Sequence, residues 1–213
     1  MKGLTVIRQG FVLAIICFVA LTACSSEKAS EKGGVNEQGK ATAFVASHPA
    51  QGDMSPDGNI FVSLTPGAPV LNILKIDKEQ KQTQLALPRP AADVVMVTPE
   101  QALLSFGPSG EVAVADVKKG KVSEPVKVGT NAQGLCRAPG NQALIADPDA
   151  KQLSLFDLAT GKVVKTFAVS GKPTQMRWVT EGIELEAANA EGKVLGKVKI
   201  TEAAAAPTEP AKK

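Results

Sequence analysis

A turn motif that returns about every 41 residues is the feature that most constrains how this chain of 213 residues can fold. Pro56, Pro99 and Pro139 are 43 and 40 residues apart, and Thr180 follows 41 residues after Pro139. Each lies in a short motif between two apolar stretches: Ser55-Pro56-Asp57-Gly58, Thr98-Pro99-Glu100-Gln101, Ala138-Pro139-Gly140-Asn141 and Thr180-Glu181-Gly182. A fixed period of this length is typical of repeat architectures, in which each unit is one supersecondary structure.

Strand-like sequence follows each turn. The first runs are residues 59–64, 102–106, 143–146 and 183–187, and alternating runs closed by Asp follow at residues 72–77, 112–116 and 153–157. Alternation of apolar and polar residues between turns predicts antiparallel strands. Because four short strands in about 41 residues is the period of a β-propeller blade, we expect an all-β propeller of about four blades. A β-sandwich with accidental periodicity is an alternative.

One unit matches a known repeat in some detail. Residues 156–167, FDLATGKVVKTF, with the later Gly171-Lys172-Pro173, resemble YVTN-type propeller repeats. Those repeats have a strand ending in Asp, a Thr-Gly or Thr-Asn turn, a Val-rich strand and a Gly-Pro step. The motif Ser55-Pro56-Asp57-Gly58 is similar to the turn that opens the next blade in that family. The resemblance is good in units one and three and looser in two and four, and it implies WD-like propeller blades.

The two ends of the array suggest how it closes. The fourth unit stops at Ile200 after three strands, and residues 43–49, AFVASHP, precede the first turn as residues 167–173, FAVSGKP, precede the fourth. We therefore expect the N-terminal strand to complete the last blade, which would leave no long edge strand exposed. Because four blades make a small propeller, an open array and half of a dimeric eight-bladed ring are alternatives.

The N-terminus has the layout of a secretory signal peptide, with Lys2 and Arg8 before an apolar run over residues 11–23. That run is shorter than the roughly 20 residues that a membrane-spanning helix needs. The junction Leu21-Thr22-Ala23-Cys24 resembles the lipobox of bacterial lipoproteins. The resemblance implies cleavage before Cys24, acylation of Cys24 and anchoring in the bacterial cell envelope. Ser25 stands where enteric inner-membrane lipoproteins have Asp, which implies the outer membrane, facing the periplasm.

These features divide the chain into four parts. Residues 1–23 are the expected lipoprotein signal peptide, 24–42 the lipidated Cys and a flexible tether, 43–200 the propeller-like domain and 201–213 a disordered tail. The tether and the tail lack apolar periodicity, so they have little to bury.

Composition excludes several classes of function. Without Lys2 and Arg8, 22 of the 24 basic residues remain against 21 acidic ones, so the basic surface of a nucleic-acid-binding protein is not expected. One His and no Tyr offer little for metal binding or acid–base catalysis, and we expect no metal and no cofactor. Cys17 lies in the signal peptide and Cys24 would be acylated. No second cysteine is then left for an intrachain disulfide with Cys136, and its place in a predicted strand indicates a buried thiol.

The remaining polar motifs are predicted to be structural. Asp53, Ser55, Asp57 and Asn59 space oxygen atoms like a calcium loop, but Leu64 stands where the closing Glu should be. The other candidates and their expected roles are Asp147 and Asp149 as solvated turn residues, His48 as a surface or turn residue, Trp178 as a core residue, and residues 118–121 as a basic hairpin tip.

The sequence thus predicts no catalytic residue. It favours a non-catalytic, lipid-anchored envelope protein whose propeller is an interaction platform for an envelope protein that the sequence does not identify. The alternatives are a propeller-type enzyme or redox protein and a small-ligand binding protein. YVTN-like propellers also occur in haem-bearing reductases, which supply ligands such as His, and here His48 is the one imidazole.

Overall fold

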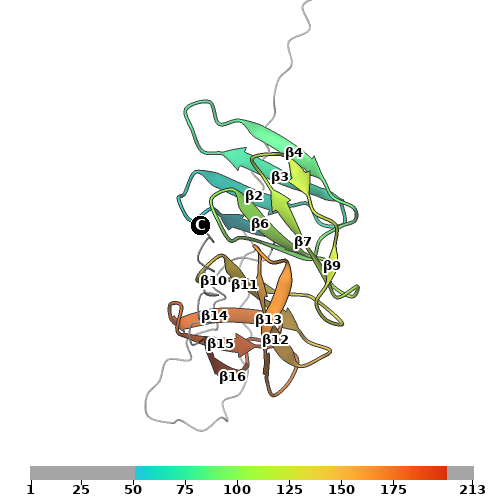
Figure 1. Cartoon of the computed structure of the whole chain (residues 1–213), viewed down its shortest axis with the longest axis vertical. Helices are drawn as coiled ribbons and strands as arrows, with labels where there is room; N and C mark the ends of the chain where they lie inside the picture. Colours follow the sequence, from blue (N-terminus) through green and yellow to red (C-terminus); the bar gives the residue numbers. More distant parts are fainter. Residues whose placement is uncertain (1–50, 201–213) are drawn as a thin grey trace, which may run out of the picture. The chain divides into compact units, whose positions relative to one another are not determined.

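The computed structural model describes residues 51–200, which contain sixteen strands and no helix (Figure 1). The strands are β1 (Gly52–Met54), β2 (Ile60–Leu64), β3 (Val70–Lys75), β4 (Gln82–Ala86), β5 (Asp93–Met96), β6 (Gln101–Ser105), β7 (Glu111–Asp116), β8 (Lys121–Val122), β9 (Val126–Lys127), β10 (Leu135–Ala138), β11 (Gln142–Asp147), β12 (Gln152–Asp157), β13 (Lys162–Ala168), β14 (Gln175–Thr180), β15 (Glu184–Ala188) and β16 (Val194–Lys199). No helix within this range is long and apolar enough to cross a membrane.

The strands form four antiparallel sheets, each built from consecutive strands. Their orders are β1-β2-β3-β4, β5-β6-β7-β8, β10-β11-β12-β13 and β14-β15-β16, with β9 also paired to β7. Each predicted turn motif joins the first strand of a sheet to the second, and the predicted runs coincide with β2, β6, β11 and β15 and with β3, β7 and β12. The structure therefore confirms the all-β, propeller-like architecture with four blade-like sheets.

Proline interrupts the outer strand of the second blade. β8 pairs with Ala115 and Asp116 of β7, whereas β9 pairs with Glu111 and Val112 farther along the same strand. Pro125 lies directly before β9 and has no N–H to donate to the ladder. The fourth strand of this blade is consequently split into two short pieces.

Three apolar clusters pack the blades against one another. The clusters lie between the first and second, the second and third, and the third and fourth sheets. In β6, Ala102 and Leu104 face the first sheet and Leu103 faces the third. The first three strands of each middle blade are therefore mostly buried on both faces, and in β11 every residue after Gln142 is buried.

The two end blades are apolar mainly on their inward faces. In β15, Leu185 and Ala187 enter the cluster shared with the third blade, whereas Glu186 accepts hydrogen bonds from Arg177. No apolar cluster of residues 51–200 joins the fourth sheet to the first. These residues thus form an open array, and the expected closing strand, residues 43–49, lies outside the described residues.

Candidate functional site

The first strands of the four blades line a cavity of about 460 Å³. Asp53 of β1, Val95 of β5, Arg137 of β10 and Trp178 of β14 all line it. The turns after β10 and β14 contribute further residues, namely Pro139, Glu181 and Gly182. The third and fourth of the repeated turns therefore border the cavity.

Asp53 and Arg137 form the polar centre of this cavity. Oδ2 of Asp53, which is 8% exposed, accepts hydrogen bonds from the backbone N–H of Met96 at 2.9 Å and from Nη2 of Arg137 at 3.3 Å. The same Nη2 donates to the carbonyl oxygen of Met54 at 3.1 Å. These bonds tie the first blade to the second and third, and they compensate for burying the carboxylate.

Asp93 makes a second connection of this kind at the start of β5. Its Oδ1 accepts from the N–H groups of Val94 at 2.8 Å and Gln51 at 3.3 Å, and its Oδ2 accepts from the N–H of Leu135 at 2.8 Å. The carboxylate is 4% exposed. It thus gives hydrogen-bond partners to backbone amides of three blades, between sheets that share no ladder.

Trp178 packs against the core and also lines the cavity. Its Nε1 donates to the carbonyl oxygen of Arg137 at 3.0 Å, and its ring packs against the cluster between the third and fourth blades. The predicted core packing is confirmed in this respect, but the half-buried ring also lines the cavity. Cys136 is 1% exposed, which confirms the predicted burial of the thiol.

Glu181 is the exposed acid of the cavity. Its carboxylate makes no hydrogen bond or ion pair with the described part of the chain. Oδ1 of Asp53 likewise accepts no hydrogen bond from residues 51–200, although Oδ2 accepts two. The Glu181 carboxylate and Oδ1 of Asp53 therefore have no hydrogen-bond donor among the described residues.

The predicted solvation of the Asp147-Pro148-Asp149 turn is wrong for Asp147. Asp147 is 2% exposed, and it accepts hydrogen bonds from the N–H groups of Asp149, Ala150 and Thr130 and from the Thr130 hydroxyl. Burial alone would raise the pKa of this carboxyl, but these hydrogen bonds hold it below its ordinary value. Asp149 is exposed as predicted, and lies 3.9 Å from Nζ of Lys172.

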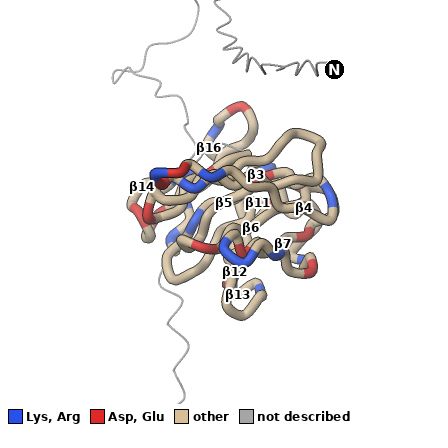
Figure 2. The backbone as a smooth tube through the Cα atoms, turned by 90° about the horizontal axis from the view of Figure 1, so that it is seen from above, with Lys and Arg blue, Asp and Glu red and all other residues tan. Residues whose placement is uncertain are grey.

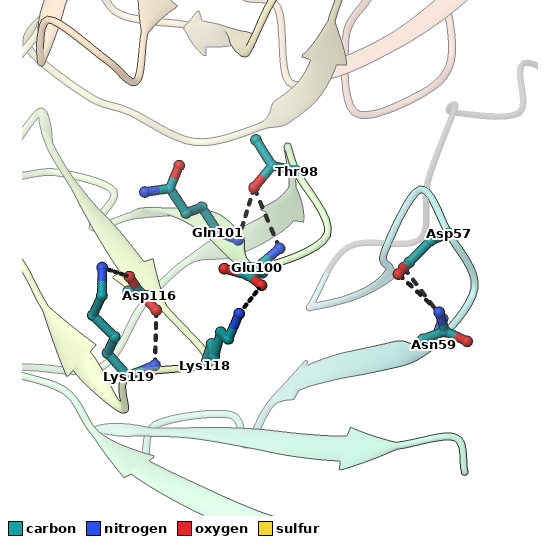
Figure 3. A network of polar contacts seen from close by, with 8 residues as sticks. All are labelled: Asp57, Asn59, Thr98, Glu100, Gln101, Asp116, Lys118 and Lys119. Atoms are coloured by element: carbon teal, nitrogen blue, oxygen red, sulfur yellow. Dashed lines mark hydrogen bonds and ion pairs between the residues drawn. The ribbon is translucent and has the colours of Figure 1, made fainter.

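The calcium-like motif is a turn whose polar atoms bind one another. Asp57 accepts a hydrogen bond from the Ser55 hydroxyl at 2.6 Å. It also accepts one from Nδ2 of Asn59 at 2.8 Å (Figure 3). The Ser55 hydroxyl oxygen accepts from the N–H of Ile60 at 2.9 Å. Asp53 points away from this turn, toward β5 and β10. Within residues 51–200 no three acidic, Cys or His side chains come together as a metal site would require.

Ion pairs compensate two lysines of the basic hairpin tip. Nζ of Lys118 lies 2.5 Å from Glu100, and Nζ of Lys119 lies 2.9 Å from Asp116 (Figure 3). The hydrogen bond to Glu100 raises the pKa of Lys118. More widely, Lys and Arg positions are interspersed with Asp and Glu positions along the backbone (Figure 2).

Sequence reasoning missed Arg137 and Glu181, which line the cavity, and Asp93, which connects the blades around it. The available signal for Asp93 and Arg137 was a charged residue within or next to a short apolar stretch, because a charge is not buried in a core without partners. Glu181 belongs to the fourth turn motif and carried no signal of its own. Cys24 and His48 lie outside the described residues.

No protein-family model matches the sequence, and no curated protein matches it. Among solved structures, it is similar to hydrazine synthase from Kuenenia stuttgartiensis, with a TM-score of 0.58 and 21% identity over 80% of this chain and 53% of that one. It is also similar to the WD40 repeats of RRP9, with a TM-score of 0.54 and 9% identity over 68% of this chain and 47% of that one. The chain thus spans about half the length of these structures, and the likeness shows a β-propeller fold.

Proposed function

We propose that this protein is a lipid-anchored envelope protein whose propeller domain is a non-catalytic platform for binding another envelope protein. The proposal rests on the hydrogen bonds that the charged side chains at and beside the cavity make. Asp53, Asp93 and Arg137 bind backbone groups of neighbouring blades, so they brace a scaffold. A braced scaffold with an accessible cavity among its turns is typical of propellers that present loops to partners.

The anchor of the proposal comes from the sequence. Leu21-Thr22-Ala23-Cys24 has the form of a lipobox, and several acyl chains would hold the protein durably on a membrane. We place it on the outer membrane, facing the periplasm, because Ser25 follows the cysteine. The mature protein would then present its turns to partners at the membrane surface.

A Cys24→Ala variant tests the anchor. We expect it to accumulate unprocessed or to leave the membrane fraction, because acylation at the Cys24 thiol precedes cleavage in the lipoproteins that it resembles. Cys136→Ala is the matched control, since it removes the other cysteine of the mature chain and leaves the lipobox intact. Mature, membrane-bound Cys24→Ala protein in a fractionation would contradict the proposal.

The platform is tested separately. Crosslinking of the tagged, membrane-bound protein in cells should capture one envelope protein reproducibly, and an excess of untagged protein should compete with it. The likeness in fold to hydrazine synthase supports the enzyme alternative, but a shared fold does not establish an activity for this chain. Bound haem or metal in the purified protein, by absorbance and elemental analysis, would favour that alternative and contradict the platform.

A further inference from the structure

The cavity lined by the first strands of the four blades has an excess of negative charge. Asp53, Arg137 and Glu181 line it, with formal charges of −1, +1 and −1. Arg137 and Asp53 are hydrogen-bonded to each other, so these two charges compensate. Glu181 has no cationic partner within residues 51–200, and the net charge of −1 at the cavity favours a cationic ligand.

The cavity also offers acceptors at two depths. Asp53 is nearly buried and its Oδ1 accepts no hydrogen bond from the described residues, whereas Glu181 is exposed. A ligand that extends from Glu181 toward Asp53 would contact a carboxylate at both positions. A long side chain with a cationic end has this form.

An aromatic ring and apolar groups form the rest of the wall. The hydrogen bond from Nε1 of Trp178 to Arg137 orients the indole, and Pro139 and Val95 line the same cavity. An indole attracts cations to its face and also packs against methylene groups. The wall therefore suits an aliphatic stem that carries a positive charge.

We infer that the cavity binds a Lys or Arg side chain of the partner protein, held by Glu181, Asp53 and Trp178. This inference rests on the proposed function, which requires a protein partner. Nη1 of Arg137 makes no hydrogen bond within residues 51–200, so it is available to donate to a backbone carbonyl of the same partner segment. Arg137 would thus position the peptide while the carboxylates bind its basic side chain.

The chain contains its own reporter for this site. Trp178 is the single Trp and there is no Tyr, so the tryptophan emission of the mature protein comes from the cavity wall. We would titrate the mature protein with the capped peptide acetyl-Gly-Lys-Gly-amide at low salt. The expected result is a saturable change in emission that weakens at high salt. The same peptide with norleucine has a similar stem without the charge, and it should bind several times more weakly.

Glu181→Gln tests the role of the acid and keeps the size of the side chain. It should weaken binding of the lysine peptide by about threefold to fivefold, as expected for loss of an exposed ion pair. Glu191→Gln is the matched control, because Glu191 is an exposed acid outside the cavity lining. Equal binding of the lysine and norleucine peptides, or full binding by Glu181→Gln, would overturn the inference.

Two further results distinguish this inference from the proposed platform function and from binding of the protein's own C-terminal tail. A partner that is crosslinked equally well by the Glu181→Gln protein would leave the platform standing and overturn the lysine site. Lys212 and Lys213 belong to this chain and are possible occupants. If replacing both by Gln made the lysine peptide bind more tightly, the cavity would belong to the protein's own tail and the partner assignment would be wrong.

Discussion

At the scale of single residues, buried aspartates link blades that share no sheet. Asp53 accepts a hydrogen bond from the N–H of Met96, and Asp93 accepts one from the N–H of Leu135. Both donors lie on the first strand of a blade, and the aspartate that each one binds belongs to the preceding blade in the chain. A buried N–H must find an acceptor, so the inner strands gain side-chain acceptors from the adjacent blade.

Asp147 should make the free energy of unfolding depend on pH in the acidic range. Hydrogen bonds hold the pKa of Asp147 below its ordinary value of 3.8, so the folded state binds its proton less readily than the unfolded state. The stabilisation is therefore present above pH 3.8 and is lost as the pH falls through the folded pKa. We expect Asp147→Asn to be less stable at pH 7 and to lose less stability between pH 5 and pH 2.5, measured by urea unfolding.

Asp149→Asn is the matched control for this prediction, because Asp149 lies in the same turn with its carboxylate exposed. Its stability should follow the wild-type pH profile. The account of Asp147 would be wrong if Asp147→Asn and the wild type lost stability in parallel as the pH fell. Glu186 contributes in the same direction, since the hydrogen bonds from Arg177 lower its pKa, so Asp147→Asn should keep some acid sensitivity.

At the scale of elements, packing on two faces explains why the middle strands look continuously apolar. β6 and β11 each belong to two clusters, with alternate residues facing opposite neighbours. β15 lacks a second described apolar neighbour, and its sequence Glu-Leu-Glu-Ala-Ala starts with alternation. Packing on both faces thus accounts for the continuous apolar runs of β6 and β11.

Gly134 controls how closely the third and fourth blades approach. A Cβ on Gly134 would collide with the backbone carbonyl oxygen of Thr174, which precedes β14. Because a carbonyl in a packed backbone cannot move aside easily, we expect Gly134→Ala to destabilise the protein by about 1–3 kcal/mol. Thermal or urea unfolding followed by circular dichroism would measure this loss.

Gly196→Ala in β16 is the control for close approach. Nothing lies within 4 Å of a Cβ placed there, so the variant should be as stable as the wild type or slightly more stable. If both variants unfolded at the same denaturant concentration as the wild type, the spacing of these blades would not depend on Gly134.

At the scale of the whole molecule, the open question is whether the array closes. The first sheet already has four strands without residues 43–49, and the fourth sheet has three described strands. We expect a fragment that starts at Ala41 to melt well above one that starts at Ala50. The reason is that Phe44 and Val45 would each contribute about 1.5–3 kcal/mol when buried in the last blade. Thermal unfolding of the two fragments makes the comparison.

A deletion of residues 26–40 is the control for closure, because it removes the expected tether and keeps the expected closing strand. It should leave the melting temperature unchanged. Equal melting temperatures for the Ala41 and Ala50 fragments would mean that residues 43–49 are only a linker and that the four blades remain an open array.

The sequence by itself determined the repeat, the strands and the turns. These features depend on neighbours within a few residues: period-two alternation, Pro and Gly in turns, and the spacing between Pro56, Pro99 and Pro139. The burial of Cys136 also followed from the strand around it, which the structure confirms at 1% exposure. Local patterns indicate such features because side chains alternate between the two faces along a strand and because Pro and Gly favour particular turns.

Only the tertiary structure decided which charged residues meet. Asp53 and Arg137 are 84 residues apart, and Asp93 binds amides 42 residues away on either side. Nothing local distinguishes Asp53, turned toward the cavity, from Asp57, bound within its own turn. Asp147 was expected at the surface for the same reason, since its partner Thr130 comes from a separate connection. The packing of successive blades brings these groups together, and their hydrogen bonds offset the desolvation that burial imposes.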